Sequence, residues 1–283
     1  MKKILLATTA LVATTGFAAA EMTWTGSANI GMKYSDQGTT QLHEEIDLGM
    51  AATGETDGGI GWKVEMGLDS NVTDSSNGGV GTVDGGSVTL TGDFGSIRVG
   101  NVSSAGTSIG LTDLGFDDIG ADDAAELGRN ATTASASADV QWNYAMDEIA
   151  LMGSFDTATD DMAISAKWSS GSLAIGISHA AAGATGGADA TAGSIGTSVG
   201  GFAINMMAAS NSDSTKNSLG LSASMPVDGL GTVTFVTGSN DTDAKSSYGV
   251  GFSKSLGGGA TLAGAYGSMN GNDKADIGIK LSF

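Results

Sequence analysis

The feature that most constrains the fold is a strict alternation of apolar with polar or small residues over the last ten positions. The apolar positions are Ile277, Ile279, Leu281 and Phe283. A strand with this pattern has one apolar and one polar face. In a water-soluble sheet the apolar face packs on a core. Here the alternation recurs along most of the chain, which indicates one face turned to lipid and one to water, as in a transmembrane β-barrel.

Sixteen segments carry this alternation, most of them about 9–11 residues long, which is the length of a tilted membrane strand. Short turns alternate with longer connections between them, as is typical of bacterial barrels. The predicted fold class is therefore all-β, a transmembrane antiparallel barrel of sixteen strands. The predicted strands span 22–34, 41–52, 58–69, 86–94, 96–102, 138–146, 148–156, 161–169, 172–180, 192–200, 202–209, 217–226, 231–239, 246–255, 259–268 and 274–283.

The aromatic residues give a second indication of a membrane barrel. On the predicted strands they fall into two bands on the apolar face, as do the aromatic girdles at the two membrane interfaces. The alternative is a soluble β-sandwich, which also alternates but has no reason to sort its aromatic residues by height. The band near the short turns holds Trp24, Trp62, Tyr144, Trp168 and Phe283, and the other band holds Tyr34, Phe155, Tyr248 and Tyr266.

Residues 1–20 have the pattern of a secretory signal peptide. Lys2 and Lys3 precede an apolar stretch at 4–13, and small residues at 18–20 form a cleavage site. The mature barrel domain is then 21–283, exported through the periplasm to the outer membrane. The signal peptide holds two of the 12 basic residues and none of the 31 acidic ones, so its removal changes the net charge from −19 to −21. This charge excludes nucleic acid as a partner.

The longest predicted connection, 103–137, is strongly acidic. It is either a solvated surface loop or a segment folded into the barrel that narrows it, where carboxylates would favour cations. No cofactor is required, but acid-rich exported chains often bind calcium through carboxylates. The candidate calcium ligands are Asp117, Asp118, Asp122 and Asp123. The acidic residues of this connection are Asp113, Asp117, Asp118, Asp122, Asp123 and Glu126.

The inward positions of the first five predicted strands supply the other candidate pore residues. Among the basic ones, Lys63 is expected near mid-height, with Lys33 higher and Arg98 lower. His43 and Asp47 are about 13 Å apart along a strand, too far for a catalytic pair, and no Ser/His/Asp set is readable. The chain is therefore not expected to be an enzyme. The predicted wall residues are Lys33, His43, Glu45, Asp47, Lys63, Glu65 and Arg98.

Motifs at both ends of the chain resemble the general-diffusion porins of the Rhodobacter type. The similar stretches are EMTWTGSANIGM at 21–32, GDFGSIRVG at 92–100, TDL at 112–114, YGVG at 248–251, LGGGA at 256–260 and ADIGIK at 275–280. The resemblance implies a homotrimer of sixteen-stranded barrels in outer-membrane lipid. It also implies that 103–137, as the third extracellular loop, folds into the lumen as a constriction, and that Phe283 belongs to an assembly signal in the last strand.

The implied function is passive diffusion of small hydrophilic solutes and ions. The chain departs from the family pattern on the barrel wall, where Asn29 and the stretch His43-Glu44-Glu45 stand in place of arginines. Acidic residues then outnumber basic ones in the lumen, so a cation preference is predicted. The alternatives are a narrower solute-selective channel and a non-conducting adhesive barrel.

Overall fold

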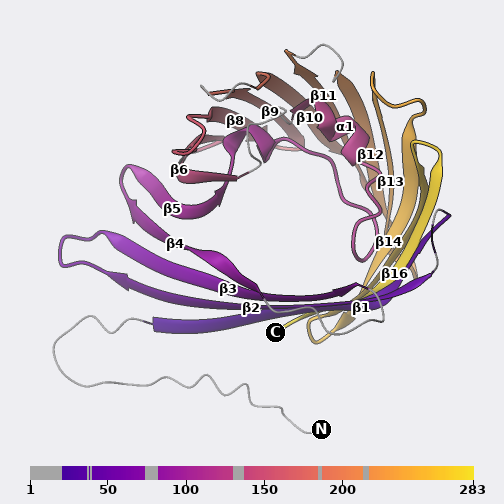
Figure 1. Ribbon diagram of the computed structural model, residues 1–283, viewed down its shortest axis with the longest axis horizontal. Helices are drawn as coiled ribbons and strands as arrows, with labels where there is room; N and C mark the ends of the chain where they lie inside the picture. Colours follow the sequence, from indigo (N-terminus) through magenta and orange to yellow (C-terminus); the bar gives the residue numbers. More distant parts are fainter. Residues whose placement is uncertain are drawn as a thin grey trace, which may run out of the picture.

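The computed structural model describes residues 21–36, 38, 40–73, 82–129, 137–183, 187–212 and 217–283. Within these residues, sixteen antiparallel strands form a closed barrel, because the last strand pairs with the first (Figure 1). The strands are β1 (Glu21–Ser35), β2 (Gln41–Glu55), β3 (Gly61–Thr73), β4 (Thr82–Gly92), β5 (Gly95–Ser103), β6 (Ser137–Met146), β7 (Ile149–Phe155), β8 (Met162–Ser170), β9 (Leu173–Ala181), β10 (Ala190–Val199), β11 (Phe202–Asn211), β12 (Ser218–Val227), β13 (Gly231–Asn240), β14 (Ser247–Gly257), β15 (Ala260–Met269) and β16 (Asn272–Ser282).

The predicted barrel of sixteen strands is confirmed, and each predicted segment overlaps one strand. The largest boundary differences are in β3 and β4. β3 extends to Thr73 because its backbone continues to pair with β2, where Thr73 is opposite His43. The loss of apolar alternation at its end hid this extension from the sequence. The predicted signal peptide at 1–20 lies outside the described residues.

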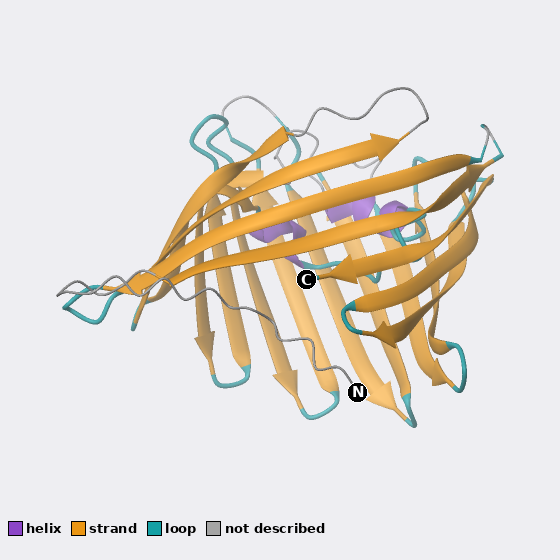
Figure 2. Cartoon of the chain, turned by 90° about the horizontal axis from the view of Figure 1, so that it is seen from below, coloured by secondary structure: helices purple, strands orange, loops and turns teal. Residues whose placement is uncertain are grey.

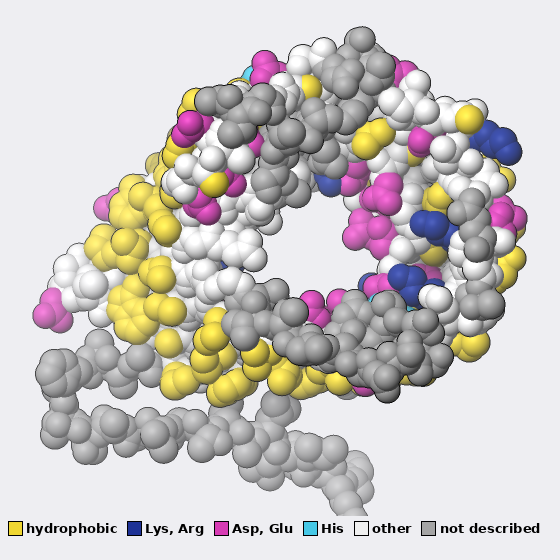
Figure 3. All heavy atoms as spheres, viewed as in Figure 1, with side chains coloured by type: hydrophobic (Ala, Val, Ile, Leu, Met, Phe, Trp, Pro, Cys, Tyr) yellow, Lys and Arg dark blue, Asp and Glu magenta, His cyan; other side chains and the backbone are white. Residues whose placement is uncertain are grey.

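The outer face of the barrel is apolar. Strand pairing places Ile30 opposite Ile279 and Met32 opposite Ile277, so outward side chains of β1 and β16 form continuous apolar rows. All four are exposed, with between 39% and 53% of each residue accessible. Figure 3 shows hydrophobic side chains gathered on the outer surface of the ring. An apolar surface of this extent requires a lipid environment.

The connections differ between the two rims, as Figure 2 shows. Tight turns join alternate pairs of strands at one rim. At Gly200–Gly201, φ is 60° and 87°, so both residues take the left-handed conformation that a two-residue type I′ hairpin requires. The longest connection at the other rim follows β5, at the position predicted for the long loop.

The segment after β5 contains three short helices, η1 (Ala105–Ser108), α1 (Asp123–Glu126) and η2 (Leu127–Arg129). Figure 1 shows α1 inside the ring of strands, and α1 contacts β11, β12 and β13. No helix in the described ranges is long and apolar enough to cross a membrane. We refer to residues 104–129 as the inner segment.

Apolar side chains of the inner segment pack on the inward faces of the strands. Leu114 and Ile119 are buried with Val236 of β13, and Ile109 is buried with Met207 of β11. The wall beneath the segment is made of small residues, which leave room for it. The buried small residues of β9 to β12 include Ser178, Ala180, Ala190, Ala192, Ala209, Ser218 and Ser222.

The C-terminal residue closes the seam between β1 and β16. The backbone N–H of Phe283 donates to the Gly26 carbonyl at 2.9 Å, and the Gly26 N–H donates to the Phe283 carbonyl at 2.7 Å. The Phe283 ring covers Gly26, where a β-carbon would collide with it, and 70% of Phe283 is exposed to the outside. The aromatic ring thus fills the space above a glycine at the seam.

Deletion of Phe283 is expected to reduce the amount of protein assembled in the outer membrane more than it reduces the stability of the folded barrel. The deletion removes two backbone hydrogen bonds at the rim but leaves the rest of the β1–β16 ladder. Outer-membrane fractions and thermal unfolding of the refolded protein would measure the two effects. Wild-type levels of the truncated protein in those fractions would contradict a role for Phe283 in assembly.

Candidate functional site

Phe116 fixes the inner segment to the seam of the barrel. Phe116 is 0% exposed. Its ring lies over Gly31 of β1 and Gly278 of β16, which are paired across the seam. A β-carbon at Gly31 would be 2.6 Å from the ring, and one at Gly278 would be 2.7 Å from it. Only glycine allows this approach. On β2, the neighbouring His43 meets the ring edge-on, with centroids 5.5 Å apart.

Asp276 of β16 binds the backbone of the inner segment beside Phe116. Its Oδ2 accepts hydrogen bonds from the N–H groups of Phe116 and Asp117, both at 3.1 Å. Its Oδ1 accepts one from the Ala265 N–H at 2.9 Å, and Asp276 is 5% exposed. Asp276 was not among the pore residues predicted from the sequence. Its inward position between two outward apolar residues was the available signal, but nothing local indicates its partners.

The side chain of Asp117 lies among residues of the barrel wall. It forms an ion pair with Lys33 of β1, and its Oδ2 is 3.4 Å from Nε2 of His43. Glu45 of β2 is on the same side, with Oε2 at 3.6 Å from that nitrogen. Three predicted wall residues and one predicted loop residue therefore meet in one cluster, which we call the seam cluster (Lys33, His43, Glu45 and Asp117).

Wall side chains also hold the backbone of the inner segment along its length. Asn205 donates to the Gly110 carbonyl at 3.0 Å, and Asn240 donates to the Ala124 carbonyl at 3.2 Å. Serines on three further strands make similar contacts. They are Ser154 with Ala105, Ser178 with Gly106, and Ser218 with Ala125 and Gly128. The path of the segment is thus set by polar contacts as well as by apolar packing.

Glu126 joins two distant parts of the inner segment. Its Oε1 accepts a hydrogen bond from the Leu111 N–H at 2.9 Å, while its Oε2 is paired with the Arg129 guanidinium. Arg129 also donates to the Ile109 carbonyl. Glu126 and Arg129 therefore stabilise the conformation of the inner segment. Burial raises the pKa of Glu126, although the Arg129 charge opposes the shift.

A second group of carboxylates is formed by Asp113, Asp118 and Asp122, whose oxygens lie within 4.8 Å of one another. The four predicted calcium ligands do not meet as one group in the described residues. Asp118 and Asp122 lie with Asp113, whereas Asp117 belongs to the seam cluster, and Asp123 lies beside Gly120. The reason is that Phe116 anchors Asp117 to the wall, which turns its side chain away from Asp118.

Burial, together with the negative charges of Asp118 and Glu126, raises the pKa of Asp122 to about 7. Burial also raises the pKa of Asp118, as does the charge of Asp113. Asp122 is only 2% exposed. Since a buried carboxylate without a cation favours its neutral form, the packed inner segment holds these protons more tightly than the unfolded chain does.

Packing of the inner segment on the wall is therefore expected to weaken as the pH rises from about 4 through about 7. The folded pKa of Asp122 exceeds its unfolded value, so its contribution is complete at the acidic end and is lost on ionisation. Since each pKa unit corresponds to about 1.4 kcal/mol, the loss is at most about 4 kcal/mol. Hydrogen exchange of residues 105–129, corrected for intrinsic rates, should show more protection at pH 5 than at pH 8. The Asp122→Asn variant should remove most of this difference, and equal protection of the wild type at both pH values would contradict the expectation.

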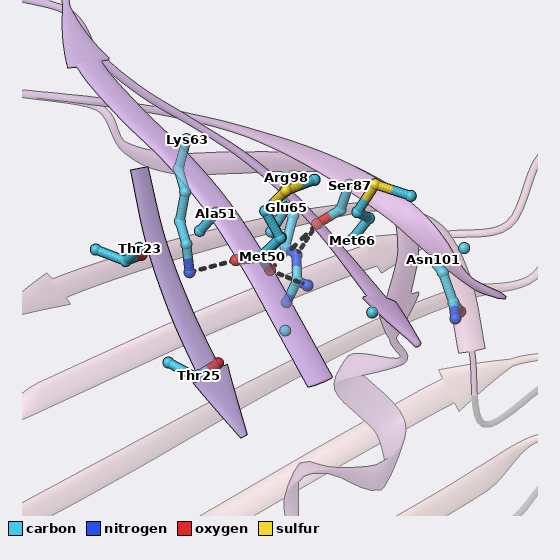
Figure 4. A pocket seen from close by; sticks show the side chains of 13 residues that line it. Thr23, Thr25, Met50, Ala51, Lys63, Glu65, Met66, Ser87, Arg98 and Asn101 are labelled. Carbon is cyan, nitrogen blue, oxygen red and sulfur yellow. Dashed lines mark hydrogen bonds and ion pairs between the residues drawn. The ribbon is translucent and has the colours of Figure 1, made fainter. Parts of the chain in front are cut away.

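Lys63, Glu65 and Arg98 form a second charged cluster on the wall, shown in Figure 4. Both basic side chains are paired with Glu65, and Ser87 connects Arg98 to the same carboxylate by hydrogen bonds of 2.8 Å and 3.2 Å. They line a concavity of about 330 Å³. Strand pairing places Lys63 and Arg98 opposite the same residue, Thr89 of β4, so both side chains reach Glu65.

A row of polar pairs on β1 and β2 leads from this cluster toward the seam cluster. Ser27 donates to Asp47 at 3.1 Å, and Asn29 donates to Glu45 at 3.0 Å. His43 and Asp47 lie on the same face of β2. The carboxylates next to the His43 ring, however, are those of Glu45 and Asp117. Figure 3 shows an open passage through the ring, with acidic and basic side chains at its edge.

The closed sheet, its apolar outer face and its charged interior define a transmembrane β-barrel with an aqueous passage. The chain belongs to the Gram-negative porin family, whose model matches residues 7–276. Similar solved structures include two triple mutants of the Rhodopseudomonas blastica porin and a variant of it with alanine in place of a lysine and an arginine. Each is 17% identical, covers 93% of this chain and 100% of its own, and has a TM-score of 0.79. At this identity the likeness concerns the fold. A comparison with curated protein sequences found no match.

Proposed function

We propose that the protein is an outer-membrane pore for the passive diffusion of small hydrophilic solutes and ions, with a preference for cations. The observation that carries this proposal is the open passage lined by charged and polar side chains inside a ring whose outer face is apolar (Figure 3). A solute in such a passage keeps water or polar groups around it, so it crosses without a costly loss of hydration. Membership of the Gram-negative porin family supports the same function.

In this proposal the inner segment is the constriction. It packs against β7 to β16 and reaches β1 and β2 at the seam cluster, whereas the second charged cluster lies on the wall of β3 and β5, in a concavity lined by no described residue of the inner segment. Solutes then pass between the segment and that wall. Size selection follows from the volume of the segment, and charge selection follows from the carboxylates on both sides.

The preference for cations rests on the pairing of four basic residues inside the barrel. Lys33 is bound to Asp117, Arg129 to Glu126, and both Lys63 and Arg98 to Glu65. Paired charges create a weak field beyond their immediate surroundings. The carboxylates of Asp47, Asp113, Asp118 and Asp122 form no ion pair with a basic side chain in the described residues, so they contribute most to the potential when they are ionised.

We further propose that the protein is a homotrimer in outer-membrane lipid. The chain would reach the outer membrane by export through the periplasm. The test is a planar-bilayer recording with the purified, detergent-solubilised protein in salt solution. Conductance should rise in groups of three equal steps for each insertion, because each barrel of a trimer conducts independently. Insertion without any conductance would favour a non-conducting barrel, and single steps with a monomeric band on an unheated gel would exclude the trimer.

A further inference from the structure

We infer that His43, Glu45 and Asp117 form a binding site for a divalent transition-metal ion of the Zn²⁺ type. One potential ligand atom from each residue lies within 4.8 Å of the other two. Nε2 of His43 is 3.6 Å from the Glu45 carboxylate and 3.4 Å from the Asp117 carboxylate. In a tetrahedral zinc site with bonds of about 2.0–2.1 Å, two ligand atoms are about 3.3 Å apart. The three groups are thus close to the spacing that such an ion needs.

The burial of His43 points to a ligand rather than to a solvated side chain. The residue is 2% exposed, and neither ring nitrogen has a hydrogen-bond partner within the described part of the chain. A buried polar atom without a partner costs about 1–3 kcal/mol. The ring cannot turn to solvent because Phe116 packs against it. Its Nε2 points at two carboxylates, and a metal ion between them would satisfy all three groups.

The donor set selects the class of metal. One imidazole and two carboxylates suit Zn²⁺ and similar ions, whereas Ca²⁺ takes six to eight oxygen ligands. The side chains of Glu45 and Asp117 are 22% and 19% exposed, so a fourth position is open to water. Asn29 donates to the Glu45 carboxylate at 3.0 Å and orients it, as groups around metal ligands commonly do. In the structure the Lys33 ammonium forms an ion pair with Asp117. A bound metal ion would displace the ammonium, and the partly exposed Lys33 side chain can turn toward solvent.

The site joins two parts of the molecule that are far apart in sequence. His43 and Glu45 belong to β2, whereas Asp117 belongs to the inner segment. Bound metal would therefore fasten the inner segment to the wall beside Phe116. This inference concerns binding alone, so it can be tested without reference to conductance and does not depend on the proposed pore function.

The test is isothermal titration calorimetry of the full-length, untagged protein, folded in detergent and titrated with zinc chloride. One Zn²⁺ per chain is expected for the wild type. The variants His43→Asn, Glu45→Gln and Asp117→Asn should each bind at least about tenfold more weakly, since loss of even an outer partner of a metal ligand costs 10- to 100-fold. The matched control is His179→Asn, which changes the second of the two histidines and should bind like the wild type.

X-ray absorption of the zinc-loaded wild type provides a measurement that requires no variant. One nitrogen and two or three oxygen ligands at about 2.0–2.1 Å are expected. A shell with oxygen ligands alone would overturn the assignment, as would unchanged affinity in His43→Asn or weakened binding in His179→Asn. Calcium chloride serves as the second titrant, and calcium binding that is as tight as zinc binding and is weakened in Asp117→Asn would overturn the proposed class of metal.

Discussion

Replacing Asp276 with alanine is expected to release the inner segment from the seam of the barrel and to increase single-channel conductance. The substitution leaves three N–H groups, those of Phe116, Asp117 and Ala265, without their acceptor. Each buried donor left unsatisfied costs about 1–3 kcal/mol. Two of the three belong to the inner segment, so most of this cost is avoided if the segment leaves the wall.

Conductance in a planar bilayer and limited proteolysis in detergent would measure this release. The variant should conduct more per step than the wild type and should be cut faster within residues 104–129. The control is Asp273→Asn on the same strand, because the Asp273 side chain accepts a hydrogen bond from the Tyr266 hydroxyl and none from the described residues of the inner segment. If Asp276→Ala matches the wild type in both measurements, Asp276 is not what holds the segment in place.

Neutralising Asp113, Asp118 and Asp122 to asparagine is expected to produce a large loss of cation preference at pH 8. At about 8 Å in water, one charge contributes about 0.5 kcal/mol, and screening at physiological salt reduces this to roughly 0.2 kcal/mol. Three charges then change the partitioning of a monovalent cation by about a factor of three. The alkaline pH is needed because the pKa of Asp122 is raised to about 7.

The zero-current potential across a salt gradient would measure this preference. It should have the sign expected for cations in the wild type and move toward zero in the triple variant. Addition of calcium should have the same effect if it binds these carboxylates. A matched control is Asp139→Asn, since Asp139 binds Thr157 rather than this group. A wild-type potential of the anionic sign would refute the cation preference, and an unchanged potential in the variant would show that these three residues do not set it.

The sequence by itself determined the barrel. A strand between lipid and water must alternate, and each of its backbone groups must pair with a neighbouring strand. Both requirements act on consecutive residues, so the pattern from Ile277 to Phe283 and its recurrences were sufficient to predict sixteen strands. The position of the long connection followed from the count of strands before it. The charged residues on the wall followed from the inward phase of β1 to β5.

The interior could not be read in the same way, because it depends on residues that only barrel closure brings together. Lys33 and Asp117 are 84 positions apart, and Asp276 and Phe116 are 160 apart. The Ala-, Gly- and Ser-rich strands β9 to β12 have weak alternation because their inward faces are covered by the inner segment rather than by water. The acidic residues of 103–137 suggested a solvated loop as readily as a packed one.

Only the tertiary structure assigned these residues their partners. Phe116 needs two glycines on β1 and β16 beneath its ring, and the pairing of Gly31 with Gly278 supplies them. That contact fixes where Asp117 lies, and it separates Asp117 from the aspartates with which the sequence had grouped it. Alternation is a local property that the solvent on each face imposes on every strand. The contacts inside the barrel instead depend on the register of strands that are distant in sequence, which no local pattern encodes.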